Sequence, residues 1–151
     1  MSDFKAVAII PFPNFFEGRN ISVNKAKETY GQKEEWQGKG DAYRHLVWQA
    51  LMAKKYGDTA ANLMGQYHEL PLGRGVGAAA WDQTAEEKAM DLYNNELGRK
   101  IAAQAKTPDQ IYSLAKKAVD TGKAKFIPIS VIEARSRQKE IEDAKEEQSA
   151  Y

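Results

Sequence analysis

Polar side chains that could carry chemistry are concentrated in the segment from Gly40 to Tyr56. Read as a helix, this segment repeats one face at three- and four-residue spacing. That face carries Asp41, Arg44, His45, Trp48, Leu51, Met52 and Lys55. Its apolar half must turn toward a core, so Asp41, Arg44 and His45 are carried toward the interior as well. A charge rarely enters an interior unpaired, because removing it from water is costly. We therefore expect these three residues either to meet other polar groups or to line a cleft.

Further polar residues lie on two later predicted helices. His68 and Glu69 stand where the second helix ends, and Asp91 and Asn95 share a face of the third at a spacing of four residues. Adjacent asparagines are unfavourable in mid-helix, so a tertiary hydrogen bond or a ligand should compensate for them. If the helices form a bundle, these groups converge at one end. The predicted cluster consists of Asp41, His45, His68, Glu69, Asp91 and Asn95.

A cluster of this composition suits general acid–base chemistry. Histidine titrates near neutral pH, and a neighbouring carboxylate can orient it or share its proton. The catalytic candidates are His45, His68, Glu69 and Asp91, and a binding or structural network would comprise Asp41, Arg44, Trp48, Asn94 and Asn95. The same nitrogen and oxygen atoms could hold a divalent metal, but no H-E-x-x-H spacing specifies one. The cofactor is therefore left open.

Each part of the predicted cluster also has a purely structural interpretation. Asp41, Arg44 and His45 could simply cross-brace buried helices. His68 could be only a histidine that the helix dipole favours at a C-terminus. Trp48 and the other aromatic residues are more typical of a core or a loop anchor than of a substrate platform.

Local signals predict the first two helices. The first begins at Asp41, a suitable N-cap, and ends at Gly57. The second is capped by residues 58–59, runs to about residues 68–69 and is ended by Pro71. Its predicted apolar face consists of Ala60, Leu63, Met64 and Tyr67. Residues 70–83 form a glycine-rich loop without the pattern of a phosphate-binding loop.

Two more helices and a charged tail complete the expected fold. Thr84 and Glu87 form a capping box at the start of the third helix, and Thr107 with Pro108 opens the fourth. A short extended link leads to a charged helix that begins near Ser130 and continues to about residue 147. We predict an all-α fold, a compact bundle of four to five helices with an extended N-terminal arm and a charged C-terminal helix.

The chain divides into three predicted parts. Residues 1–39 form the extended arm, residues 40–122 the helical domain with the polar cluster, and residues 123–151 a linker and the charged helix. Residues 6–10 could form a short edge strand. Residues 24–36 could hold a short helix, which two glycines weaken. Phenylalanines could pin the arm onto its own core or onto a partner, namely Phe4, Phe12, Phe15 and Phe16.

Composition excludes several classes of protein. The absence of cysteine rules out disulfides, thiolate metal sites and cysteine nucleophiles. A formal net charge of +1 gives no indication of nucleic-acid binding. No apolar run approaches the roughly 18–20 residues of a membrane span, and prolines interrupt the apolar N-terminal patch that a signal peptide would need. We expect a soluble protein without a signal peptide or transmembrane segment.

Three sequence blocks occur in a distinctive order over about residues 40–102. They are D-A-Y-R-H-L-V-W from Asp41, H-E at His68 and M-D-L-Y-N-N-E-L-G-R from Met90. This order resembles a little-characterised helical domain found in bacterial polymorphic toxins and bacteriophage proteins. The resemblance implies a signature formed by Asp41, Arg44, His45, Trp48, His68, Glu69, Asp91, Asn94 and Asn95. It implies no established reaction.

Two classes of function remain open. We favour an assembly role, such as a phage virion component, which would contact other protein chains through the N-terminal arm and the C-terminal helix. The alternative is a small hydrolase with a His–carboxylate or metal site, acting on a cell-envelope polymer, a lipid or a nucleotide. The expected location is the virion or the host cytoplasm.

Overall fold

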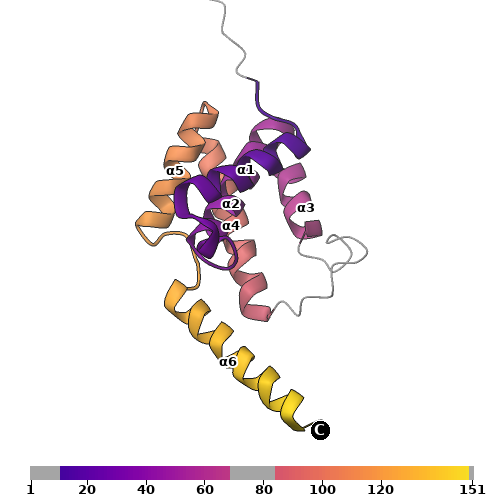
Figure 1. Ribbon diagram of the computed structural model, residues 1–151. Coiled ribbons are helices and arrows are strands. Elements are labelled where there is room, and N and C mark those ends of the chain that lie inside the picture. The colour runs from indigo at the N-terminus through magenta and orange to yellow at the C-terminus, as the bar shows by residue number, and fades with distance from the viewer. Residues whose placement is uncertain (1–10, 69–83, 150–151) are drawn as a thin grey trace, which may run out of the picture.

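The computed structural model describes residues 11–68 and 84–149, and all regular secondary structure in this part of the chain is helical (Figure 1). It contains six α-helices and one short 3-10 helix. They are α1 (Phe15–Tyr30), η1 (Gln32–Glu34), α2 (Lys39–Tyr56), α3 (Asp58–His68), α4 (Ala85–Gln104), α5 (Pro108–Asp120) and α6 (Ile129–Ser149). The all-α prediction is confirmed, with more helices than the four to five expected. The strand predicted at residues 6–10 and the loop at 70–83 lie outside the described residues.

Helix α2 is the centre of the fold. Its buried positions run almost continuously from Gly40 to Met52, because α1, α3, α4 and α5 all pack against it (Figure 1). The core around it is built from small and branched apolar side chains of these helices. A helix that is surrounded on most sides cannot keep a polar face in water. The polar residues of α2 are therefore buried and need partners from neighbouring helices.

The N-terminal segment is helical where an extended arm was expected. Residues 15–30 form α1, whose N-cap Asn14 makes a capping box with Glu17. Gly18 brings α1 close to α2, since a Cβ added there would lie 2.5 Å from the methyl carbon of Met52. Phe15 packs edge-on against Trp48 with 5.7 Å between the ring centroids. The prediction of an extended arm is thus wrong for residues 15–30, which form α1 and pack on the domain's own core. The short helix expected within residues 24–36 is present in part, as the end of α1 and the turn of η1.

The predicted helix starts are largely correct, with one shift in α2. Thr84 caps α4 in a capping box, and Thr107 caps α5, which has proline in its first turn. Helix α2 begins at Lys39 with Gly38 as its N-cap, so Asp41 lies inside the first turn and is not the cap. The Asp41 carboxylate nevertheless accepts a hydrogen bond from the backbone N–H of Gln37, just before the helix. Asp41 thus accepts a hydrogen bond from a backbone N–H that precedes the helix, although Asp41 itself lies inside the helix.

The predicted apolar face of α3 is only partly correct, since Met64 packs against the core while Leu63 and Tyr67 do not. The buried residues of α3 are Ala61 and Gly65, whereas Leu63 and Tyr67 are 61% and 59% exposed. The small residues face inward because α3 lies close to α2 and α4. A Cβ added at Gly65 would lie 2.5 Å from the side-chain nitrogen of Gln49. Close helix approach, and not apolar side-chain size, decides the orientation of α3.

The segment after α5 is anchored, and the helix that follows it is not buried. The linker is fixed by hydrogen bonds from Asn94 to the backbone of Lys125 and from the N–H of Ile127 to the carbonyl of Gln37. Helix α6 then extends away from the other helices and has no buried residue (Figure 1). Within the described residues, none of the helices combines the length and apolarity needed to cross a bilayer.

Candidate functional site

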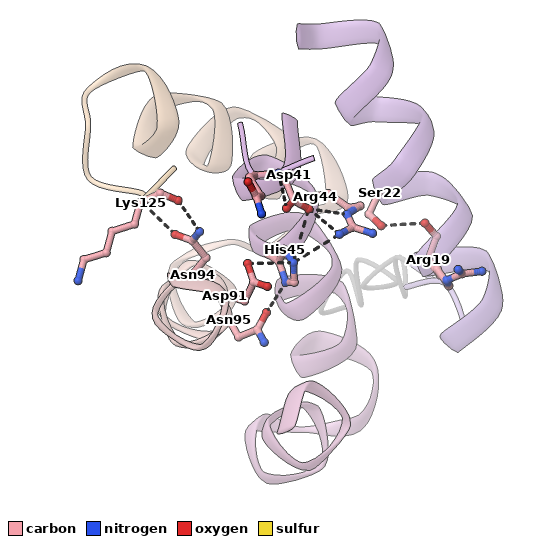
Figure 2. A network of polar contacts seen from close by, with 10 residues as sticks. Arg19, Ser22, Asp41, Arg44, His45, Asp91, Asn94, Asn95 and Lys125 are labelled. Atoms are coloured by element: carbon pink, nitrogen blue, oxygen red, sulfur yellow. Dashed lines mark hydrogen bonds and ion pairs between the residues drawn. The ribbon is translucent and has the colours of Figure 1, made fainter. Parts of the chain in front are cut away.

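The candidate site lies where the N-terminal half of α2 packs against the middle of α4. Asp41, Arg44 and His45 come from α2, and Asp91 and Asn95 come from α4 (Figure 2). Asp41 and His45 are four positions apart, as are Asp91 and Asn95, so each pair projects from one face toward the other helix. His45, Asp41, Asp91 and Asn95 are all buried. The sequence-predicted convergence of these residues is confirmed as geometry, while their function stays a prediction.

The imidazole of His45 is held on both sides. Its Nδ1 lies 2.9 Å from Oδ1 of Asn95. Since an amide oxygen only accepts, Nδ1 is the donor in this contact. The other nitrogen, Nε2, lies 3.6 Å from Oδ1 of Asp41 and 3.5 Å from Oδ1 of Asp91. Nε2 therefore faces two carboxylates, and Asn95 fixes the ring in that orientation (Figure 2).

The Asp41 carboxylate accepts hydrogen bonds at both of its oxygens. Its Oδ2 accepts the Gln37 N–H, and its Oδ1 accepts from the Arg44 guanidinium at 2.5 Å. Burial alone would raise the pKa of Asp41, but the nearby His45 and Arg44 and the Gln37 N–H together lower it below its ordinary value. Asp41 is thus kept as a carboxylate in a buried setting.

Arg44 lies at the border between the site and solvent. Besides its ion pair with Asp41, its terminal nitrogen is 3.5 Å from Nε2 of His45. Its side chain is 26% exposed, whereas that of Asp41 is 7% exposed. The guanidinium can therefore be hydrated on one side while it neutralises Asp41 on the other.

His68 joins the site from the last residue of α3. Its ring centroid lies 6.3 Å from that of His45 and 5.7 Å from that of Trp48. The two histidines of the chain thus lie on the same side of the domain, as the sequence predicted. Trp48 packs in the core beside them, consistent with the structural interpretation. Glu69, the remaining catalytic candidate, lies outside the described residues.

The two adjacent asparagines of α4 do different things. Asn94 donates from Nδ2 to the carbonyl of Lys125 and accepts the Lys125 N–H at Oδ1, so it fixes the linker before α6. Asn95 instead contacts His45. Both have the tertiary hydrogen bonds that their unfavourable mid-helix position required. Only Asn95 belongs to the site.

Sequence reasoning missed Gln49, which lies one turn after His45 on α2. Gln49 is fully buried, and neither polar atom of its amide has a hydrogen-bond partner among the described residues. The Asn95 Nδ2 is likewise buried without a hydrogen-bond partner among the described residues. Both nitrogens approach the backbone of Gly65 on α3. The four-residue spacing of Asp41, His45 and Gln49 was the available signal.

Three of these residues offer the atoms of a metal site. One oxygen of Asp41, one nitrogen of His45 and one oxygen of Asp91 all lie within 4.8 Å of one another. Imidazole nitrogen and carboxylate oxygen are common ligands of divalent transition metals. The arrangement could also transfer a proton between His45 and a carboxylate. Both chemistries use the same three side chains.

Comparison with known families adds one result to this geometry. The sequence profile of a family described as a domain of unknown function (DUF6973) matches residues 7–123. The chain belongs to this family. The matched region includes α1 as well as the site helices and ends before α6. No curated protein and no solved structure matches the chain significantly. The expectation of an uncharacterised domain family is confirmed, and the connection to toxins and phages stays a prediction.

Proposed function

We propose that this protein is a small hydrolase whose reactive centre is the cluster of Asp41, His45 and Asp91. The single observation that supports this proposal is the orientation of His45, whose Nε2 faces both carboxylates while Asn95 holds Nδ1. A histidine that served only to brace two helices would need only one hydrogen-bond partner on each helix. Here a single nitrogen has two acidic neighbours, which is an arrangement for handling a proton or a cation.

The proposed task of the cluster is to activate a water molecule. The water attacks the scissile bond, loses a proton and leaves its oxygen on the cleaved product, and the leaving group gains a proton. His45 and the carboxylates can accept the proton directly, or they can hold a cation that lowers the pKa of the water. The chain has no cysteine, which excludes a thiolate nucleophile. The substrate classes we propose are a cell-envelope polymer, a lipid or a nucleotide.

Replacement of Asp91 by asparagine tests the hydrolase proposal. Purified protein is assayed on chromogenic ester, phosphodiester, amide and glycoside substrates, with and without added divalent cations. On any substrate that the wild type hydrolyses, Asp91→Asn should lower kcat/KM by about 100-fold, because the asparagine keeps the shape and loses the charge. The matched control is Asp58→Asn at the start of α3, since the Asp58 side chain is 76% exposed and pairs with Arg99 of α4 instead of with a residue of the cluster. Equal rates in wild type and Asp91→Asn would overturn the proposal.

We propose an assembly role as the second candidate, and α6 is the observation that favours it. Helix α6 spans 21 residues without a buried side chain, and Val131 and Ile141 are exposed. Its first turn has no acidic residue and its last turn no basic one, so its own dipole gains little from its charges. Most of the stability of helices in proteins comes from tertiary packing of an apolar face, and α6 has no such packing within the described residues. A partner chain would supply the missing contacts, in a virion or in another assembly.

Deletion of residues 129–151 should leave the rest of the domain folded. Because α6 buries nothing, we expect the melting temperature to change by less than about 2 °C. The same deletion should remove any association seen by sedimentation of the full-length chain. A control deletion of residues 1–28, which removes most of α1 and its packing on α2, should unfold the protein. A large loss of stability on deletion of α6 would show that this helix belongs to the domain, and the assembly proposal would fail.

A further inference from the structure

We infer that Asp41, His45 and Asp91 bind a single divalent transition-metal cation. This inference rests on the proposed hydrolase function and deepens it, because it names the group that activates the water. The three ligand atoms come from buried side chains of two helices and lie within 4.8 Å of one another. Three protein ligands leave coordination positions for water and substrate.

The distances between the ligand atoms match a metal site. Nε2 of His45 lies 3.6 Å from the Asp41 oxygen and 3.5 Å from the Asp91 oxygen. Ligands bound at roughly 2.0–2.2 Å in a tetrahedral arrangement are about 3.4 Å apart. Neither contact is short enough for a normal hydrogen bond. These two distances are close to those that a cation between the atoms would require, and the third pair of ligand atoms lies within 4.8 Å.

Neighbouring groups orient the ligands as in other metal sites. A histidine ligand usually donates its second ring N–H to a carbonyl or a carboxylate, which fixes the ring. Asn95 accepts this hydrogen bond at 2.9 Å, and its side chain is buried. The Gln37 N–H occupies Oδ2 of Asp41 and leaves Oδ1 turned toward His45 (Figure 2). Two of the three ligands are thus held in a binding orientation by partners outside the ligand set.

The Arg44 guanidinium contacts two of the atoms that would bind the cation. It lies 2.5 Å from the same Asp41 oxygen and 3.5 Å from Nε2 of His45. Because its side chain is partly exposed, it can move into solvent when a cation arrives. Arg44 and the cation are therefore alternative partners of Asp41. Loss of Arg44 should therefore increase the affinity of the site for a cation. In a purely structural ion network, loss of Arg44 would produce no such increase.

Titration of the full-length protein with Mn²⁺ and Zn²⁺ by calorimetry tests this site. We expect one site per chain, binding about fivefold tighter in Arg44→Met, from which the competing ion pair is removed. Binding should be at least about 100-fold weaker in Asp91→Asn, which loses a ligand, and unchanged in Asp58→Asn. Wild-type affinity in Asp91→Asn, or no gain of affinity in Arg44→Met, would overturn the inference.

A second measurement needs no variant at the site. Substoichiometric Mn²⁺ should broaden the ring proton signals of both His45 and His68 in the NMR spectrum, because the two rings are close together. Unbroadened histidine signals would overturn the inference. These readouts do not depend on catalysis, so the two proposals can fail separately. Hydrolysis that persists after removal of metal, with no cation bound, would retain the hydrolase and reject the cation site. Cation binding without hydrolysis would retain the cation site and reject the hydrolase.

Discussion

Gly98→Ala is expected to destabilise the domain by about 2–3 kcal/mol, although alanine is the better helix former. A Cβ at this position of α4 would lie 2.7 Å from the backbone carbonyl oxygen of Leu46 and 3.1 Å from the Leu46 Cα. Backbone atoms of the central helix cannot move aside as a side chain can. Relief therefore requires α2 and α4 to separate, which loosens the most extensive helix–helix interface among the described residues.

The matched control is Gly18→Ala in α1. There the added Cβ meets the methyl carbon of Met52 at 2.5 Å, the far end of a flexible side chain that can turn away. The gain in helix propensity of roughly 1 kcal/mol then offsets the contact, and stability should stay within about 1 kcal/mol of wild type. Urea unfolding of both variants measures the difference. Equal effects at the two glycines would contradict the close crossing of α2 and α4.

The Gly98 crossing also connects stability with the candidate site. Asp91 lies about two turns and Asn95 about one turn before Gly98 on α4, and His45 directly precedes Leu46 on α2. A shift that relieves the clash at Leu46 must therefore also change the contacts of His45 with Asn95 and Asp91. We expect Gly98→Ala to impair any activity of the site more than its loss of stability alone would explain.

The site could be predicted from the sequence because its residues follow helix spacing. Asp41 and His45 are four apart, as are Asp91 and Asn95, and both pairs share faces with core residues. Once two helices are buried against each other, such faces must meet. The same spacing selects Asn95 rather than Asn94 for the cluster, because Asn95 shares a face with Asp91, and in the structure Asn95 contacts His45 while Asn94 bonds to the linker.

Other features depend on tertiary contacts that spacing does not determine. Large apolar residues suggested the buried face of α3, yet Ala61 and Gly65 are buried because that helix lies close to its neighbours. Helix α1 had a readable signal in the capping box of Asn14 and Glu17. The preceding prolines argued for an extended chain, whereas packing against α2 stabilises a helix from residue 15 onward.

Replacement of His45 by glutamine should have the largest effect on activity, with kcat about 1000-fold lower on any substrate of the wild type. Glutamine keeps polar atoms in the buried space but can neither accept a proton near neutral pH nor bind a cation as imidazole does. Asn95→Leu should lower activity by about 10–100-fold, because the ring keeps its chemistry and loses its orientation. Gln66→Leu on the exposed face of α3 is the control for an added leucine.

The double variant shows whether Asn95 acts through His45. If it does, His45→Gln with Asn95→Leu should be no slower than His45→Gln alone, because a partner that only orients the imidazole has nothing left to orient. Circular dichroism and melting curves confirm that each protein is folded before its rates are compared. A double variant whose loss equals the product of the two single losses would mean that Asn95 contributes independently of His45. Wild-type kcat in folded His45→Gln would leave the buried network with a structural role, bracing α2 against α4.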